Sequence, residues 1–85
     1  MKIWRPLTKE ELIDLSSGDK VVLRLSSRDA FQWHPSQRLK PEVITFTEAK
    51  YVEQSKRGDD ALVLKEGFDT AIWVAGAEVG RYEEA

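Results

Sequence analysis

The stretch that decides the fold is Leu7-Thr8-Lys9-Glu10-Glu11-Leu12. Thr8 and Glu11 have the spacing of a capping box, in which each side chain accepts a hydrogen bond from the backbone N–H of the other residue. Leu7 and Leu12 have the spacing of the hydrophobic staple that often accompanies such a cap. A helix that begins at Thr8 is therefore predicted.

The end of this helix and the element after it are also visible in the sequence. Gly18 suits the left-handed position that often follows the last residue of a helix. The helix is therefore expected to run from Thr8 to about Ser17. Directly after it, Val21 and Leu25 belong to an alternating apolar pattern over residues 19–26, which is typical of a half-buried strand.

Further strands are predicted where β-branched and aromatic residues gather between turns. They cover residues 43–47, 61–65 and 70–75, and a short edge strand covers 78–82. The exposed edge near residues 77–82 either pairs with a second copy of the chain or is blocked by the charges of Glu78 and Arg81. The protein is therefore expected to be a monomer or a weak homodimer.

Residues 48–54 fit either a strand or a helix, and a strand is favoured because only Ala49 and Val52 supply an apolar helical face. The predicted fold class is α+β. It consists of one N-terminal helix packed on a small antiparallel SH3-like β-barrel, or on a rolled sheet of five to six short strands.

Composition is that of a folded protein, with 41% hydrophobic and 33% charged side chains, and 85 residues predict a single small domain over 1–85. The absence of cysteine excludes disulfides and thiolate metal sites.

The first six residues lack the apolar run of a secretory signal, and no stretch has the roughly 18 apolar residues of a membrane span. A cytoplasmic protein without membrane contact is expected. The net charge of −2 disfavours a strongly basic nucleic-acid-binding domain.

The start of the chain resembles that of small prophage-borne or bacterial proteins with SH3-like barrels. The residues that carry this resemblance are Trp4-Arg5-Pro6-Leu7-Thr8, Glu10-Glu11-Leu12 and Gly18-Asp19-Lys20-Val21. The resemblance covers the first quarter of the chain, and no functional residue is transferred from it.

Residue types for catalysis and metal binding are scarce. His34 is the only histidine, and no recognised arrangement of a base and a nucleophile surrounds it. The carboxylates of two turns do not match a calcium-binding loop and are interpreted as turn formers; they are Asp59, Asp60, Glu66 and Asp69. We therefore predict no enzyme, no cofactor and no metal site.

The candidate binding segment is residues 27–41, which Pro35 and Pro41 interrupt. Residues 24–40 carry four basic side chains and one acidic one, a net charge of +3 in an otherwise acidic chain. The aromatic rings among them either cover the mouth of the barrel, anchor a protein partner or stack on the bases of single-stranded nucleic acid. The predicted partner-binding residues are Arg24, Arg28, Phe31, Trp33, His34, Arg38 and Lys40.

The favoured function is a non-enzymatic protein-binding module, such as a small accessory or inhibitory factor of a phage, prophage or mobile element that acts on a host protein. The alternative is a weak single-stranded nucleic-acid binder that uses residues 27–41. Trp73 leaves a further question open, because a one-sided sheet buries either this ring or its neighbours Ile72 and Val74. An exposed ring would mark a binding face.

Overall fold

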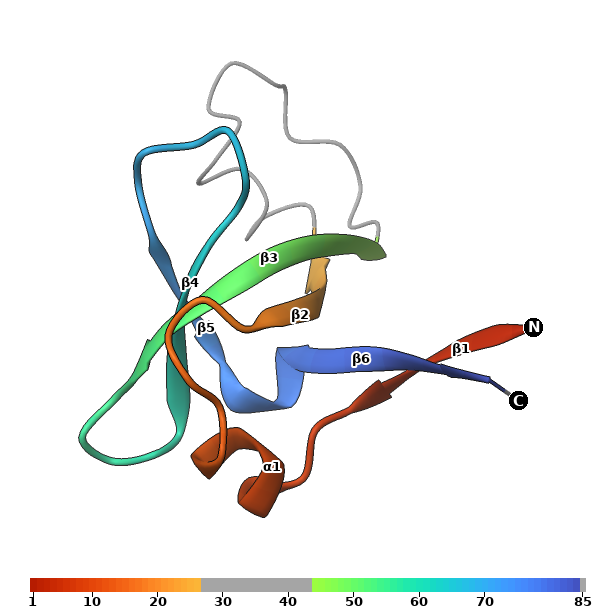
Figure 1. Ribbon diagram of the computed structural model, residues 1–85, viewed down its shortest axis with the longest axis horizontal. Coiled ribbons are helices and arrows are strands. Elements are labelled where there is room, and N and C mark those ends of the chain that lie inside the picture. The colour runs from red at the N-terminus through yellow and green to blue at the C-terminus, as the bar shows by residue number, and fades with distance from the viewer. Residues whose placement is uncertain (27–43, 85) are drawn as a thin grey trace.

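The computed structural model describes residues 1–26 and 44–84, which form a six-stranded antiparallel sheet with a short helix (Figure 1). In chain order the elements are β1 (Lys2–Pro6), α1 (Lys9–Ile13), β2 (Lys20–Ser26), β3 (Ile44–Gln54), β4 (Asp60–Leu64), β5 (Ile72–Ala75), the 3-10 turn η1 (Gly76–Glu78) and β6 (Val79–Glu84). The strand order is β1-β6-β2-β3-β4-β5, so β1 and β5 are the edges of the sheet.

The predicted α+β fold class is wrong, because the helix is short and the sheet is open. The capping box between Thr8 and Glu11 is present, but α1 has five residues and does not reach Ser17. After α1, the Asp19 carboxylate accepts a hydrogen bond from the Ser16 N–H at 2.8 Å, and the Asp19 N–H donates to the Ser16 carbonyl at 3.0 Å. Such local bonds compete with helical ones. The chain therefore leaves the helix early and turns through Gly18 at φ 96°.

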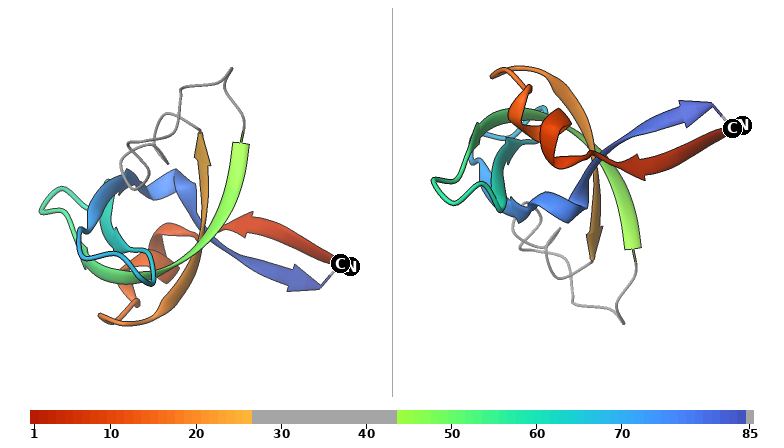
Figure 2. Two further views of the ribbon diagram at one scale, coloured as in Figure 1. Left: turned by 90° about the horizontal axis from the view of Figure 1, so that it is seen from above. Right: turned by 90° about the horizontal axis from the view of Figure 1, so that it is seen from below.

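The strands also do not close into an SH3-like barrel. β1 pairs with β6, and the two run away from the rest of the sheet with both termini at their far end (Figure 2). The opposite edge strand, β5, pairs with β4. Because β1 leaves the body of the protein, the two edges of the described sheet do not meet.

The expected edge strand at residues 78–82 is paired on both sides only at its start. β6 pairs with β1 on one side and with β2 on the other, where Gly80 lies opposite Val22 and Val79 lies opposite Leu23. At Val79 and Gly80 both sides of β6 are therefore paired within the chain, whereas residues 81–84 pair with β1 alone among the described strands. The expected edge strand is wrong for the start of this segment, and the oligomeric state of the protein stays a prediction.

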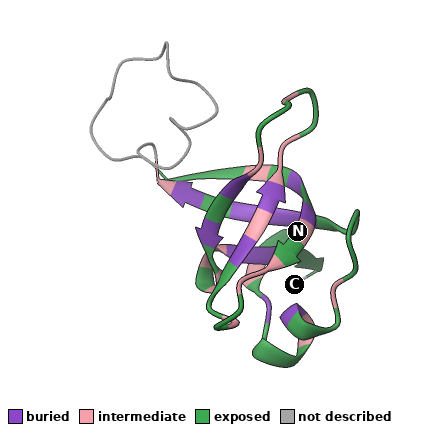
Figure 3. Cartoon of the chain, turned by 90° about the vertical axis from the view of Figure 1, so that its left-hand side faces the viewer, coloured by how far each residue is buried: buried purple, intermediate pink, exposed green. Residues whose placement is uncertain are grey.

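The core is formed by buried residues of β2–β6 together with Leu7 and Leu12, and Figure 3 shows the buried positions along the strands. The side chains most deeply buried are Leu23, Leu25, Val63 and Val79. The alternation predicted over residues 19–26 is confirmed, as is the strand at residues 48–54, which forms the second half of β3. β3 shifts register between Tyr51 and Glu53, an irregularity of the kind that bends a strand.

The chain has a radius of gyration of 12.6 Å, close to the roughly 12–13 Å expected for a compact domain of this length. Among residues 1–26 and 44–84, no helix combines the length and apolar character needed to cross a lipid bilayer.

Candidate interaction face

The face of the sheet opposite the core carries a second group of apolar side chains. Trp4 lies opposite Tyr82, and Arg24 lies opposite Phe46. Directly paired residues of antiparallel strands share a face, and so do residues two apart in one strand. The pairing of Val22 with Gly80 links the two ladders. We call the apolar side chains of this face together with Arg24 the outer cluster; its members are Trp4, Val22, Arg24, Ile44, Phe46 and Tyr82. The same face also carries Ser26 and Glu48, which lie opposite Ile44 and Val22.

Three aromatic rings of the outer cluster contact one another. The ring centroids of Trp4 and Phe46 are 5.8 Å apart with an interplanar angle of 48°, and those of Phe46 and Tyr82 are 6.5 Å apart at 49°. Tilted pairs at such distances are favoured by the charge distribution of the rings. Val22 is only 9% exposed but does not belong to the main core, so the outer face has a small apolar centre of its own.

Trp4 is held in place by a contact across β6. Its indole Nε1 donates a hydrogen bond to the Val22 carbonyl oxygen at 2.9 Å. The ring passes over Gly80, where a Cβ atom would lie 2.5 Å from Trp4 Cε2 and 2.6 Å from Cζ2. Only glycine permits such a close approach, so the indole of Trp4 can lie across β6 because residue 80 is a glycine.

The rest of the outer cluster is open to solvent. Phe46 is 48% exposed and Tyr82 is 40% exposed, and Ile44 is exposed beside Phe46 on the same strand. Arg24 is exposed as well, and it forms no ion pair with any other residue of the described ranges. The outer cluster can therefore bind apolar groups through its rings and an anionic group through Arg24.

Of the predicted partner-binding residues, Arg24 lies in the outer cluster. The other six lie outside the described residues; they are Arg28, Phe31, Trp33, His34, Arg38 and Lys40. Sequence reasoning missed Phe46 and Tyr82 as candidates. The apolar residues Ile44 and Phe46 at alternate positions were a usable signal, but Tyr82 joins them only through strand pairings between distant parts of the chain.

On the other side of β1 and β6, four charged residues tie α1 to these strands. Arg5 donates hydrogen bonds to both oxygens of Glu11 at 3.0 Å and to Glu83 at 2.6 Å, and Arg81 donates to Glu11 at 2.6 Å. The bonds from Arg5 and from the Thr8 N–H lower the pKa of Glu11 to about 2. Glu11 and Glu83 in turn raise the pKa of Arg5. The charges of this cluster are matched internally, which indicates a structural role.

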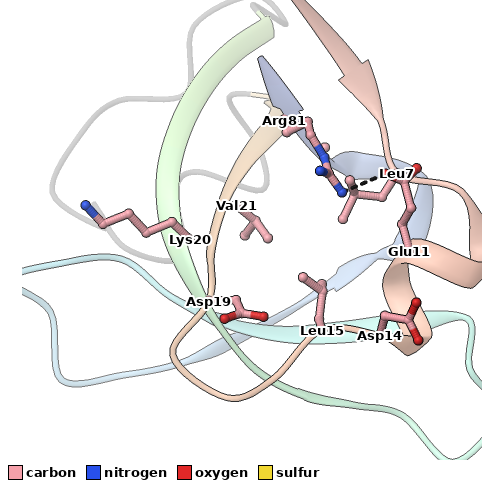
Figure 4. A pocket seen from close by; sticks show the side chains of 9 residues that line it. Leu7, Glu11, Asp14, Leu15, Asp19, Lys20, Val21 and Arg81 are labelled. Atoms are coloured by element: carbon pink, nitrogen blue, oxygen red, sulfur yellow. Dashed lines mark hydrogen bonds and ion pairs between the residues drawn. The ribbon is translucent and has the colours of Figure 1, made fainter. Parts of the chain in front are cut away.

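A hollow of about 450 Å³ lies beside this cluster, between α1 and the start of β2 (Figure 4). Leu7, Leu15 and Val21 contribute its apolar lining, and the Glu11–Arg81 bond crosses one side. Among the described residues, the lining contains no Ser, Thr, Cys or His, so these residues offer no hydroxyl or thiol nucleophile with an imidazole base. In the part of the chain that the structure describes, no group of three or more His, Cys, Asp or Glu is placed to hold a metal ion.

Comparisons with known proteins found no matching family model, no matching curated protein and no matching solved structure.

Proposed function

We propose that this protein is a non-enzymatic binding module that attaches to another protein through the outer cluster. The observation that carries this proposal is the group of three contacting rings, two of which stay largely exposed although they are fixed on strands. Rigid aromatic side chains are common interface anchors, because they bury a large apolar area with little loss of conformational freedom. The partner supplies an apolar surface for Phe46 and Tyr82 and a carboxylate for Arg24.

We place this module in the cytoplasm, because the chain has no cysteine and the reducing cytoplasm does not favour disulfides. We place it among accessory or inhibitory factors of phages, prophages or mobile elements that act on a host protein. Its size and the resemblance of its first residues support this assignment.

The proposal is tested by capture from a lysate of the source cells, with recovered proteins quantified by mass spectrometry. Phe46→Ser removes the central ring of the cluster. Ile13→Ser is the matched control, since Ile13 is 61% exposed on α1 and lies outside the cluster. Circular dichroism and thermal unfolding check that both variants remain folded.

The unmodified protein and Ile13→Ser should recover the same partner, and Phe46→Ser should recover at least about tenfold less, as expected for the loss of an interface anchor. Equal recovery by the two variants would exclude the outer cluster as the interface. Recovery of no specific partner by any of the three proteins would contradict a protein-binding function.

Weak binding of single-stranded nucleic acid is the second candidate function. It was predicted for residues 27–41, all of which lie outside the described residues. The pairing of Arg24 with Phe46 places a cation beside an exposed ring in the way such binding requires. Fluorescence anisotropy with a labelled oligothymidylate is the test. Binding that weakens with salt and with Arg24→Gln would support this function, and no binding at low salt would exclude it.

A further inference from the structure

We infer that the open edge of β5 binds an extended, basic segment of a partner protein as an additional strand. This surface is separate from the outer cluster, which lies on β1, β2, β3 and β6. β5 is the last strand of the sheet and pairs only with β4 among the described strands. Addition of a strand to an open edge is a recurring mode of peptide recognition.

The register of the ladder shows which backbone groups of β5 point outward. The Gly76 N–H donates to the Asp59 carbonyl at 2.7 Å, and these two residues continue the pairing of β4 with β5. Hydrogen-bonded and non-hydrogen-bonded pairs alternate along an antiparallel ladder. Trp73 and Ala75 therefore belong to non-hydrogen-bonded pairs, and their N–H and C=O groups face the open edge. No described residue forms a hydrogen bond with them there.

β5 is short, with four residues, but it lacks the proline, charge and bulges that also protect a sheet edge. Natural edge strands carry proline, charged side chains or bulges that prevent pairing with other chains. The opposite edge has such features, because β1 contains Lys2, Arg5 and Pro6. β5 has the sequence Ile72-Trp73-Val74-Ala75, with neither charge nor proline, and its ladder with β4 has no register shift.

Trp73 supplies a side-chain anchor at this edge. Its ring is 49% exposed, while its neighbours Ile72 and Val74 are buried, so the strand turns its largest side chain to solvent. Trp73 lies opposite the half-buried Leu62 on β4. An added strand would place an apolar side chain directly opposite this ring, where cross-strand pairs stabilise a sheet.

Charge around β4 and β5 selects the kind of segment. Residues 59–78 contain five acidic side chains and one basic side chain, a net charge of −4, and the turn before them adds the basic side chains of Lys56 and Arg57. A second copy of the protein would bring two such acidic regions together, and nucleic acid would bring phosphates. A segment with Lys or Arg between apolar residues is the complementary occupant.

Ala75→Pro tests the open edge of β5 without changing the pairing of β5 with β4. Ala75 has φ −64°, which is the value that proline imposes, and its N–H points away from β4. The substitution therefore removes one outward donor and leaves the ladder with β4 intact. Ala75→Ser keeps the N–H and is the matched control.

The probe is a synthetic peptide of alternating Lys and Val, compared with one of alternating Glu and Val, each titrated into ¹⁵N-labelled protein and followed by NMR. The Lys–Val peptide should shift the amide signals of Trp73 and Ala75, and added salt should weaken its binding. Ala75→Pro should bind it about fivefold more weakly, the effect of one lost backbone hydrogen bond. Ala75→Ser and Phe46→Ser should bind it like the unmodified protein.

Absence of shifts in β5 would overturn the inference, as would equal affinity of Ala75→Pro or equal binding of the Glu–Val peptide. Self-association of the unmodified protein in analytical ultracentrifugation, lost in Ala75→Pro, would also overturn it by showing that a second copy occupies the edge. Because Phe46→Ser leaves β5 unchanged, failure of the outer cluster as an interface can be told apart from failure of this edge.

Discussion

Replacement of Gly80 by alanine tests whether Trp4 lies across β6 as the structure shows. The added Cβ would lie 2.5 Å from Trp4 Cε2, whereas real Cβ contacts are essentially never shorter than 3.0 Å. The carbonyl oxygen of Arg5 also lies against this position. Movement of the indole alone therefore does not make room for the methyl group, and the backbone of β1 has to shift as well.

The expected cost follows from these contacts. Overpacking of this kind costs about 1–3 kcal/mol. Displacement of the indole also breaks the 2.9 Å hydrogen bond from Trp4 to the Val22 carbonyl, which adds about 1 kcal/mol. We expect Gly80→Ala to lower the free energy of unfolding by about 2–4 kcal/mol, a large part of the stability of a domain of this size.

Urea unfolding followed by far-UV circular dichroism measures this loss. In a Trp4→Phe background the ring is smaller and the indole N–H is absent, so the cost of Gly80→Ala should fall by about 1 kcal/mol or more. A cost below about 0.5 kcal/mol, typical of an unconstrained surface position, would refute the close approach of the ring. An equal cost in both backgrounds would show that Trp4 is not the residue that position 80 accommodates.

Other substitutions test the core, the charged cluster and the edge. Leu23→Ala should cost about 2–5 kcal/mol in urea unfolding because Leu23 is fully buried, and a cost no larger than that of the exposed control Ile13→Ala would contradict the assigned core. The Glu11 pKa of about 2 lies below its ordinary value of 4.5, so the stability that this carboxylate contributes is present above pH 4.5 and lost as the pH falls toward 2. Glu11→Gln should reduce the fall in stability over that interval, and an unchanged pH profile would refute the role of Glu11. Ala75→Pro should leave stability unchanged or raise it by up to about 1 kcal/mol, and a clear loss would show that the Ala75 N–H is bonded in the fold.

Sequence reasoning predicted those features whose partners lie close together in the chain. The capping box is confirmed because Thr8 and Glu11 are three residues apart, and the alternation around Leu23 predicted β2. The length of α1 was not predictable from the same information. It depends on the competition between further helical bonds and the bonds between Ser16 and Asp19, two alternatives of similar local energy.

Pairings between the ends of the chain were not accessible from local patterns. β1 was missed because it is short, ends in Pro6 and pairs with a strand at the other end of the sequence. The same pairing places the start of β6 between β1 and β2, keeps the sheet open and brings Trp4 to Tyr82. The missed strand therefore explains the error in the sheet and the residues missed in the site. Arg24 was recognised because its position on an alternating strand is a local property.

The most direct test of the protein-binding face is site-specific photo-crosslinking in the source cells. The photoreactive amino acid p-benzoylphenylalanine replaces Phe46 in one variant and Ile13 in the control variant, and the irradiated cells are analysed for covalent adducts. The proposed function predicts one adduct of defined mass from position 46 and none from position 13. No adduct from position 46, or the same adduct from both positions, would contradict binding of a protein partner through the outer cluster.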